Sequence, residues 1–451
     1  MRVRKRRNMR VWPVFTLAMA ATVCVGQAQT AMPLSLKRAV EIALAPDGNT
    51  RVALAQESIE QARSQQAQAK STFLPNLDSS VGDRRQVANL QAYGFSFKLP
   101  IPGFSIPSIV GPFTVFDARV TAQQSIFSFS DIRRYQAAKI SATAIATDAA
   151  ATRNSVSDEV ARDYLGCLLA EANRNTARAN VELSEALLKL ARQQKDAGTG
   201  TGIEVTRAEV QLANDRQSLI HAENDRNRAA LTLLKTMGLR MDAPVEFTNK
   251  LEFKPVDIAG DGALVEQARK ARPEMREQQQ RQDAARLSLG AVKDERLPSL
   301  GASADYGTIG SGIVGAHPTY TMGVSLRVPI FDGGRREARI GESSSQYRQE
   351  QIRTRDVGQQ IELQVRTALE SLRSAAAEVQ SATEGQALAE SELAQAQRRW
   401  QAGVATSVEV TDAQTRLQRA RDNLVKALYD HNVARLDLAT ATGTIGEYVN
   451  Q

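Results

Sequence analysis

The chain has 451 residues, of which 24% are charged, and its formal net charge is +7. Six positive charges stand within the first ten residues, and the first 28 residues contain no acidic side chain. The remainder of the chain therefore carries a formal charge of +1, which removes the main support for a nucleic-acid-binding protein.

The first 28 residues have the pattern of a secretory signal peptide. A basic segment precedes an apolar stretch from Val11 to Gly26, and Gly26 and Ala28 supply the small residues expected before a cleavage site. An uncleaved membrane anchor is the alternative, although about 16 apolar residues are few for a transmembrane helix. Cys24 lies inside this segment, and because Val23 before it is not small, a lipoprotein cleavage site is not expected.

Two strands are predicted in the first half of the chain, because apolar and polar residues alternate there with period 2. The alternation is weak over residues 77–81 and stronger over residues 118–126, where Gln124 interrupts the apolar face. Residues 94–112 hold four prolines and are predicted to form a long loop between the two strands.

A very long helix without proline is predicted over residues 127–198. At a rise of 1.5 Å per residue, such a helix would span on the order of 105 Å, far more than an ordinary globular helix. After a short turn, Leu212, Leu219 and Leu233 continue a heptad pattern that Arg226 interrupts. This arrangement predicts an antiparallel coiled-coil hairpin.

The second half begins after a segment, residues 239–262, that contains two prolines and two glycines. We expect this segment to link the halves as mixed structure packed outside the helical rod. Strands are then predicted over residues 300–307 and 320–330, and the second has one clean apolar face. Strands of about ten residues with unlike faces suit a transmembrane barrel, and a soluble sheet with one solvated face is the alternative for each strand alone.

A second long helix without proline is predicted over residues 331–403. Alanines recur there every seven residues from Ala368 to Ala396, beside a second series from Leu372 to Trp400. Residues 410–438 continue both series after a turn, so a second coiled-coil hairpin is predicted. A solvated coiled-coil rod would explain the heptads but not the strands.

The two halves of the chain are an internal repeat of one structural unit. A Leu-Pro-x-Leu motif occurs at 74–77 and 297–300, and an Ala-Gly turn followed by Glu-Val-Thr occurs at 197–206 and 402–411. Four strands per chain are fewer than the roughly eight of the smallest membrane barrel, so a barrel requires several chains. Two chains would give eight strands, three would give twelve and four would give sixteen, and the residues leave these alternatives open.

This order of elements resembles the TolC-type outer-membrane efflux proteins over nearly the whole chain after residue 28. Residues 34–44, Leu-Ser-Leu-Lys-Arg-Ala-Val-Glu-Ile-Ala-Leu, are similar to the family's opening helix. The Leu-Pro-x-Leu motifs resemble its helix-to-strand junctions, and residues 328–334, Val-Pro-Ile-Phe-Asp-Gly-Gly, resemble its strand-to-helix junction. The two Ala-Gly turns resemble the tips of its periplasmic coiled coils.

The resemblance implies a fold that is mainly α with a transmembrane β-barrel part, in which a tandem repeat of strand–strand–long α-helical hairpin forms a trimeric twelve-stranded barrel. The barrel would be continuous with a twelve-helix periplasmic tunnel. The chain would then divide into a signal peptide (1–28), a first structural repeat (29–238), an inter-repeat linker (239–262) and a second structural repeat (263–451).

The resemblance also implies a function and partners. The chain would be an outer-membrane channel subunit of a tripartite efflux system in a Gram-negative-type bacterium, in contact with outer-membrane lipid. It would act as a homotrimer, join a periplasmic adaptor (membrane fusion) protein and an inner-membrane pump of RND or ABC type, and conduct substrates passively. The alternatives are the outer-membrane duct of a type I protein secretion system and, in a different class, a trimeric structural or adhesive coiled-coil protein.

Glu409 and Asp412 follow the second tip turn and stand three residues apart, so both carboxylates lie on one helix face. The resemblance places this face in the narrowed end of the tunnel, where three chains would supply rings of acids that favour cations. The alternative is that acids in a first helical turn complement the helix dipole. Glu204 and Arg207 occupy the matching positions of the first half, so no second acidic pair is expected.

The resemblance further implies a polar and ionic network between neighbouring tip helices that holds the tunnel closed. Glu204 matches one acidic partner, and Trp400 stands where an aromatic residue hydrogen-bonds across. Ala405 stands at the basic partner's position, so that partner is absent. The alternative for Trp400 is a large residue that completes the heptad seam.

The two tip turns are predicted to dock the adaptor, because a small surface admits the tips of another protein's hairpins. Glycine also permits the chain to reverse with positive φ, which is an ordinary turn role. The residues of the two turns are Gly198, Thr199, Gly200, Gly403, Val404 and Ala405.

No enzymatic, cofactor or metal site is predicted. His221, His317 and His431 lie far apart and lack the spacing of a zinc site, and no phosphate-binding loop or nucleophile motif stands out. Cys167 is the one cysteine outside the signal segment, so an intrachain disulfide is not expected, and we expect it to pack as a small apolar side chain.

Overall fold

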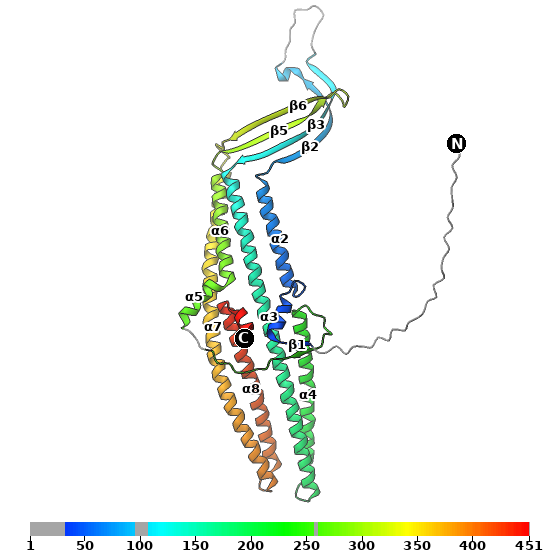
Figure 1. Cartoon of the computed structure of the whole chain (residues 1–451), viewed down its shortest axis with the longest axis vertical. Coiled ribbons are helices and arrows are strands. Elements are labelled where there is room, and N and C mark those ends of the chain that lie inside the picture. Colours follow the sequence, from blue (N-terminus) through cyan, green and yellow to red (C-terminus); the bar gives the residue numbers. More distant parts are fainter. Residues whose placement is uncertain (1–31, 95–106, 257–259, 451) are drawn as a thin grey trace, which may run out of the picture.

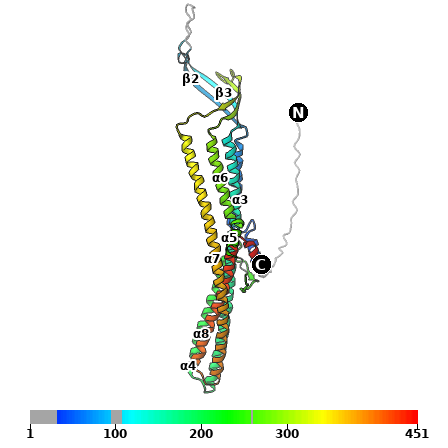
Figure 2. The same ribbon diagram turned by 90° about the vertical axis from the view of Figure 1, so that its left-hand side faces the viewer.

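The computed structural model describes residues 32–94, 107–256 and 260–450. The predicted signal peptide, with Cys24, and part of the predicted loop at 94–112 lie outside the described residues. Figures 1 and 2 show an elongated molecule, with a sheet at one end and helices that run from it to two hairpin tips at the other. None of the described helices combines the length and the hydropathy that crossing a membrane requires.

The described elements form two similar series, each made of a helix, two strands and a long helical hairpin, which confirms the predicted tandem order. The first series is α2 (Thr50–Ser71), β2 (Asn76–Asn89), β3 (Ile109–Phe127), α3 (Phe129–Asp196) and α4 (Gly202–Thr236). The second series is α6 (Pro273–Asp294), β5 (Ser299–Gly310), β6 (His317–Arg327), α7 (Arg335–Gln401) and α8 (Ser407–Thr442). The remaining elements are β1 (Met32–Leu34), α1 (Leu36–Ala43), η1 (Leu90–Tyr93), β4 (Val245–Phe247), α5 (Asp261–Ala271) and α9 (Ile445–Val449).

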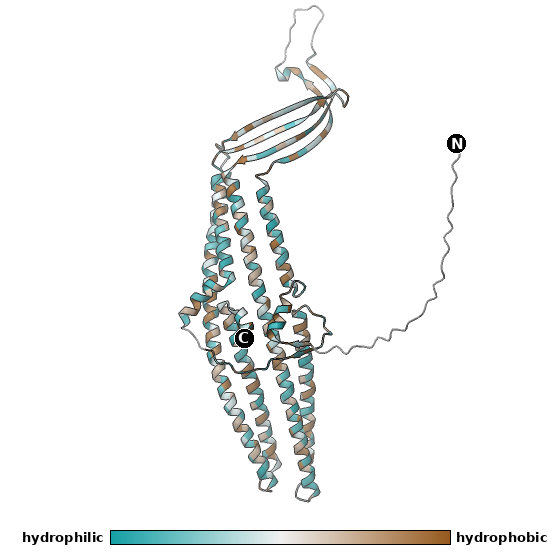
Figure 3. Ribbon diagram, in the orientation of Figure 1, coloured by the Kyte–Doolittle hydropathy of each residue, from teal (hydrophilic) through white to brown (hydrophobic). Residues whose placement is uncertain are grey.

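The four long strands form one antiparallel sheet in the order β2-β3-β5-β6. Leu77 lies opposite Ala122. Ala122 in turn lies opposite Ala304, which lies opposite Met322, so the apolar faces of all four strands coincide. The apolar side chains of β6 are 65–72% exposed, and Figure 3 shows hydrophobic and hydrophilic residues alternating along the strands. One face of the sheet is therefore apolar and uncovered within the chain.

All four strands differ from their predicted bounds. β3 begins at Ile109, so residues 109–112 of the predicted loop are strand, and β5 spans Ser299–Gly310 instead of 300–307. β2 continues to Asn89, far beyond the alternating residues 77–81, because the long strand β3 supplies backbone partners as far as Ile109. β6 ends at Arg327 instead of continuing to residue 330, because its pairing with β5 ends where Arg327 meets Ser299. Backbone pairing sets the strand ends, whereas the alternation marks only the amphipathic part.

The polar face of the sheet carries a charged cluster where the two repeats join. Arg119 of β3 donates to Asp117 at 2.8 Å and to Asp305 of β5 at 2.9 Å. Gly307 lies opposite Arg119, and a Cβ at Gly307 would stand only 2.4 Å from the Cβ of Arg119. Glycine is therefore required for the close approach of β3 and β5.

The helices below the sheet form two long hairpins. α3 and α7 contain 68 and 67 residues, so each extends about 100 Å. Their distal halves pair with α4 and α8, and their sheet-proximal halves pack with α2 and α6 (Figure 1). The predicted heptad seams are largely buried, whereas Ala382 and Gln386 are half-buried. The buried α7 positions are Ala368, Leu372, Ala375, Val379, Ala389, Leu393, Ala396 and Trp400.

The largest apolar core lies midway along the helices, where β1 and β4 form a parallel pair. Tyr164 of α3 is fully buried there, and its hydroxyl donates to the backbone oxygen of Leu34 at 2.8 Å. Residues 239–256 contribute β4 and then pass α8, where the side-chain amide of Asn432 donates to the carbonyl of Glu252 at 3.0 Å. This segment therefore straps the helices together at mid-height.

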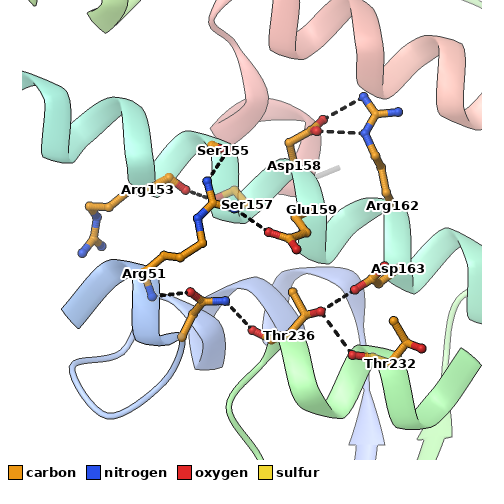
Figure 4. A network of polar contacts seen from close by, with 11 residues as sticks. Arg51, Arg153, Ser155, Ser157, Asp158, Glu159, Arg162, Asp163, Thr232 and Thr236 are labelled. Atoms are coloured by element: carbon orange, nitrogen blue, oxygen red, sulfur yellow. Dashed lines mark hydrogen bonds and ion pairs between the residues drawn. The ribbon is translucent and has the colours of Figure 1, made fainter. Parts of the chain in front are cut away.

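A polar network beside this core ties α2 to the first hairpin (Figure 4). The side chain of Asn49, which caps α2, donates to the carbonyl of Thr236 in α4 at 2.8 Å. The Thr236 hydroxyl donates to Asp163 of α3 at 2.6 Å, and Arg51 pairs with Glu159 of α3 at 2.7 Å. Three helices are thus fixed to one another at the point where α4 ends.

Candidate functional site at the hairpin tips

The tips of the two hairpins lie together at the end of the molecule away from the sheet (Figure 1). Gly198 and Gly403 have φ of 77° and 72°, which is the left-handed conformation that glycine adopts without steric cost. The backbone N–H groups of Thr199 and Gly200 both donate to the carbonyl of Gln194. These turns are compact, and apart from Val404 their side chains are small or absent.

The second turn presents an apolar side chain to solvent. Val404 is 67% exposed, whereas its neighbour Ala405 is half-buried against the apolar cluster at the tips. Ile203 and Val408, which stand in the first turns of α4 and α8, are also exposed. The surface at the tips of one chain therefore has few large side chains and is partly apolar.

Glu204 closes a capping box at the start of α4. Its carboxylate accepts a hydrogen bond from the backbone N–H of Thr201 at 2.9 Å. The carboxylate is thus already engaged within its own hairpin.

Glu409 and Asp412 both project from the exposed face at the start of α8. Glu409 faces Arg399 of α7, with 3.6 Å between a carboxylate oxygen and a guanidinium nitrogen. Asp412 forms no hydrogen bond or ion pair with any residue in the part of the chain that the structure describes. The two predicted acids are therefore unequal, because only the charge of Glu409 is offset by a nearby cation.

Trp400 is 7% exposed and packs with Leu393, Ala396 and Val410 in the apolar cluster at the tips. It therefore completes the heptad seam. It also lines a cavity of about 20 Å³ between the two hairpins, to which Glu204 and Arg207 contribute as well. The structure thus brings Glu204 and Trp400, which are nearly 200 residues apart in the sequence, to one small cavity.

A family model described as outer membrane efflux protein matches residues 42–239 and 264–444, which together hold most of the chain and both repeats. The chain belongs to the outer membrane efflux protein family. It is an outer-membrane channel of Gram-negative efflux and secretion systems, and this membership confirms the prediction that it is not an enzyme.

Individual relatives agree with this assignment. The pyoverdine export outer membrane protein OpmQ of Pseudomonas aeruginosa is 26% identical over 402 residues, which cover 85% of this chain and 81% of OpmQ. The outer membrane efflux protein BepC of Brucella suis is 28% identical over 269 residues, and the match spans 58% of each chain. The crystal structure of the CmeC outer membrane channel of Campylobacter jejuni has the same fold, with a TM-score of 0.77 at 17% identity over 91% of this chain and 85% of CmeC.

Sequence reasoning missed one group of residues in this efflux protein. Ser184 of α3, Asp215 of α4 and Gln414 of α8 are almost fully buried and hydrogen-bonded to one another between the hairpins. The signal was available at Asp215, which stands three residues after Leu212 and four before Leu219, at a core position of the heptad. The partners could not be found in the same way, because they belong to other helices.

The histidines and the cysteine of this efflux protein are placed apart from the tips. His431 is 1% exposed in α8, its ring lies 4.6 Å from that of Phe253, and burial together with the nearby Arg435 lowers the pKa of its imidazole. Burial raises the pKa of the Cys167 thiol to about 12. No group of three or more metal-binding side chains occurs within residues 32–94, 107–256 and 260–450.

Proposed function

We propose that three copies of this chain form one duct, through which substrates pass passively across the periplasm and the outer membrane. The observation that carries the proposal is the sheet, which has an uncovered apolar face and two open edges. Within the described chain, β2 and β6 each pair on one side only, and open edges of long strands call for further pairing. Three copies would supply twelve strands, a number that membrane barrels use, and six hairpins for a tunnel below them.

The narrow end of the duct is proposed to lie at the hairpin tips. Glu409 and Asp412 are exposed on one face of α8, so three copies would present two rings of three carboxylates. Such rings in a narrow passage favour cations and hinder anions. Trp400 packs in the apolar cluster shared by the two hairpins, which supports a role in holding the tips together, whereas Glu204 lies beside the same cavity with its carboxylate engaged in the capping box of α4.

The tip surface is proposed to dock the hairpin tips of a periplasmic adaptor protein, which would connect the duct to an inner-membrane pump of RND or ABC type. The exposed apolar side chains of Val404, Val408 and Ile203 support this proposal, because they surround turns of small residues that allow close approach. The position and chemistry of Glu409 and Asp412 support their proposed gate role, and those of the tip turns support the proposed docking role. A passive duct need not recognise its cargo, so the pump would select the substrate, and protein export by a type I system remains the second candidate.

Two measurements on the purified protein test the duct. Native mass spectrometry in detergent is expected to give the mass of three chains, and planar bilayer recording is expected to show discrete, cation-selective conductance steps. A monomer would contradict the shared sheet. A trimer that never conducts would contradict the duct and favour a structural coiled-coil protein.

A further inference from the structure

A buried polar layer joins the two hairpins a short distance from the tips. Ser184 of α3 and Gln414 of α8 are each 2% exposed, and Asp215 of α4 is 5% exposed. Apolar side chains lie on both sides of the layer along the helices, among them the buried Val410 and Leu417 of α8. The layer is therefore a polar interruption in an otherwise apolar seam.

The carboxylate of Asp215 is the centre of this layer. It accepts hydrogen bonds from the hydroxyl of Ser184 and from the amide of Gln211, which lies one turn earlier in α4. The amide of Gln418 donates to it at 2.9 Å, and that of Gln414 approaches it at 3.4 Å. Gln414 also donates to the Ser184 hydroxyl oxygen at 2.6 Å. The first hairpin thus supplies the acceptors, and α8 of the second hairpin supplies two amide donors.

This arrangement ties the second hairpin to the first. A buried carboxylate is costly unless its oxygens accept hydrogen bonds, and no described Lys, Arg or His forms an ion pair with Asp215. The neutral amides of Gln414 and Gln418 therefore compensate for part of its lost hydration. If α8 moved away, both the carboxylate and the amides would lose their partners inside an apolar seam.

The layer holds the part of α8 that carries the gate acids. Gln414 stands two residues after Asp412 and five after Glu409, so one continuous stretch of helix connects all three. Because a helix is stiff over one or two turns, fixing Gln414 fixes the direction in which Asp412 projects. The position of the acids therefore depends on a contact with the other hairpin.

We propose that Asp215 is a positioning residue of the gate: through Gln414 and Gln418 it holds the start of α8 against the first hairpin, so that Glu409 and Asp412 narrow the duct. This inference rests on the proposed duct function. According to this inference, the width of the passage depends on a contact between the two hairpins of one chain as well as on the gate acids themselves.

The test compares single-channel conductance and the cation-to-anion permeability ratio of variants in planar bilayers. Asp215→Ala removes both amide contacts to the carboxylate, and Gln414→Ala removes one of them together with the bond to Ser184. Both are expected to raise conductance and to lower cation preference, Asp215→Ala severalfold and Gln414→Ala by less, because Gln418 still contacts Asp215 in that variant. Gln211→Ala is the matched control, because Gln211 contacts the same carboxylate from the same helix and does not connect the hairpins. It is expected to behave like the unmodified protein.

Further variants separate positioning from general stability. The Asp215→Ala/Gln414→Ala double variant should raise conductance by less than the two single effects combined, because both substitutions break the same contact between Asp215 and Gln414. If Asp215→Ala does not assemble, Asp215→Asn, which keeps the side-chain shape and one acceptor oxygen, should assemble and show a smaller rise. A lower unfolding temperature with unchanged conductance and permeability ratio in Asp215→Asn and Gln414→Ala would overturn the inference.

The same recordings distinguish the two proposals. If the unmodified protein never conducts, the duct itself is contradicted, and the inference that rests on it is overturned with it. If the unmodified protein conducts and the Asp215 and Gln414 variants match it, only the positioning role is overturned.

Discussion

Arg119 and Asp305 form an ion pair of 2.9 Å across the line where the two repeats meet in the sheet. The strands that carry them, β3 and β5, belong to different halves of the chain and pair with each other along this line. Asp117 provides a second carboxylate for the same guanidinium. The two halves are therefore joined by matched charges on the polar face as well as by backbone hydrogen bonds.

Removing the cation at this join should weaken the assembled sheet. In Arg119→Ala, Asp117 and Asp305 would remain close together without a partner, so the temperature at which the oligomer dissociates in detergent should fall. Arg84→Ala is the control, since Arg84 lies on exposed β2 and forms no ion pair with the described residues. Equal melting of the two variants in a heated gel-shift assay would show that the pair does not stabilise the join.

Glycine at position 307 should be irreplaceable. In Gly307→Ala the new Cβ would lie 2.4 Å from both the carbonyl oxygen of Ala118 and the Cβ of Arg119, so β3 and β5 would have to move apart. Overpacking of this kind costs about 1–3 kcal/mol, and the yield of folded oligomer should drop. Gly323→Ala places its methyl group in open space in β6 and should assemble normally. Matched yields of the two variants would contradict the close approach.

The two gate acids should differ in their effect on ion selectivity. Both Glu409→Ala and Asp412→Ala should raise conductance, because each removes a charged side chain from the narrow end. The loss of cation preference should be larger for Asp412→Ala, since Arg399 already offsets the charge of Glu409. Reversal potentials in asymmetric salt measure this preference.

Arg399→Ala should change the cation preference of the same site in the opposite direction. It removes the cation beside Glu409, so the cation preference should rise above that of the unmodified protein. Conductance and selectivity that stay constant in all three variants would exclude these residues from the gate.

The stability of the folded chain should depend on pH through His431 of α8, whose ring packs against Phe253 of the inter-repeat segment. The pKa of the buried imidazole is lowered, so the unfolded chain binds a proton more readily than the folded chain does. The stabilising effect of the neutral ring is therefore complete above the ordinary histidine pKa of about 6.5 and is lost as the pH falls through that value toward the folded pKa. Thermal unfolding should show a steeper loss of stability below about pH 6.5 in the unmodified protein than in His431→Gln.

The exposed His221 supplies the control for this prediction. His221→Gln should keep the pH dependence of the unmodified protein, because the side chain of His221 is exposed and not packed in the core. If His431→Gln and His221→Gln gave the same profile, the buried ring would not be the source.

The sequence alone determined the repeating elements of this protein, because each rests on a local pattern. The alternation of residues 320–330 predicted an amphipathic strand, and the heptads of α7 predicted the positions that the structure buries, including Leu372 and Trp400. The tip turns followed from glycine in the same way. The resemblance to efflux proteins came from the order of these elements and is confirmed by the family match.

Only the tertiary structure decided how the elements meet. A shift of one residue in strand register would turn every side chain of a strand to the other face, so the shared apolar face depends on pairings such as Ala304 with Met322. The pairing of Arg399 with Glu409 and of Asp215 with Gln414 is likewise absent from any local pattern. The heptad predicted that position 215 faces a partner helix, but packing between the two hairpins decided that the partner would be α8, because contacts between distant segments depend on the relative placement of whole helices.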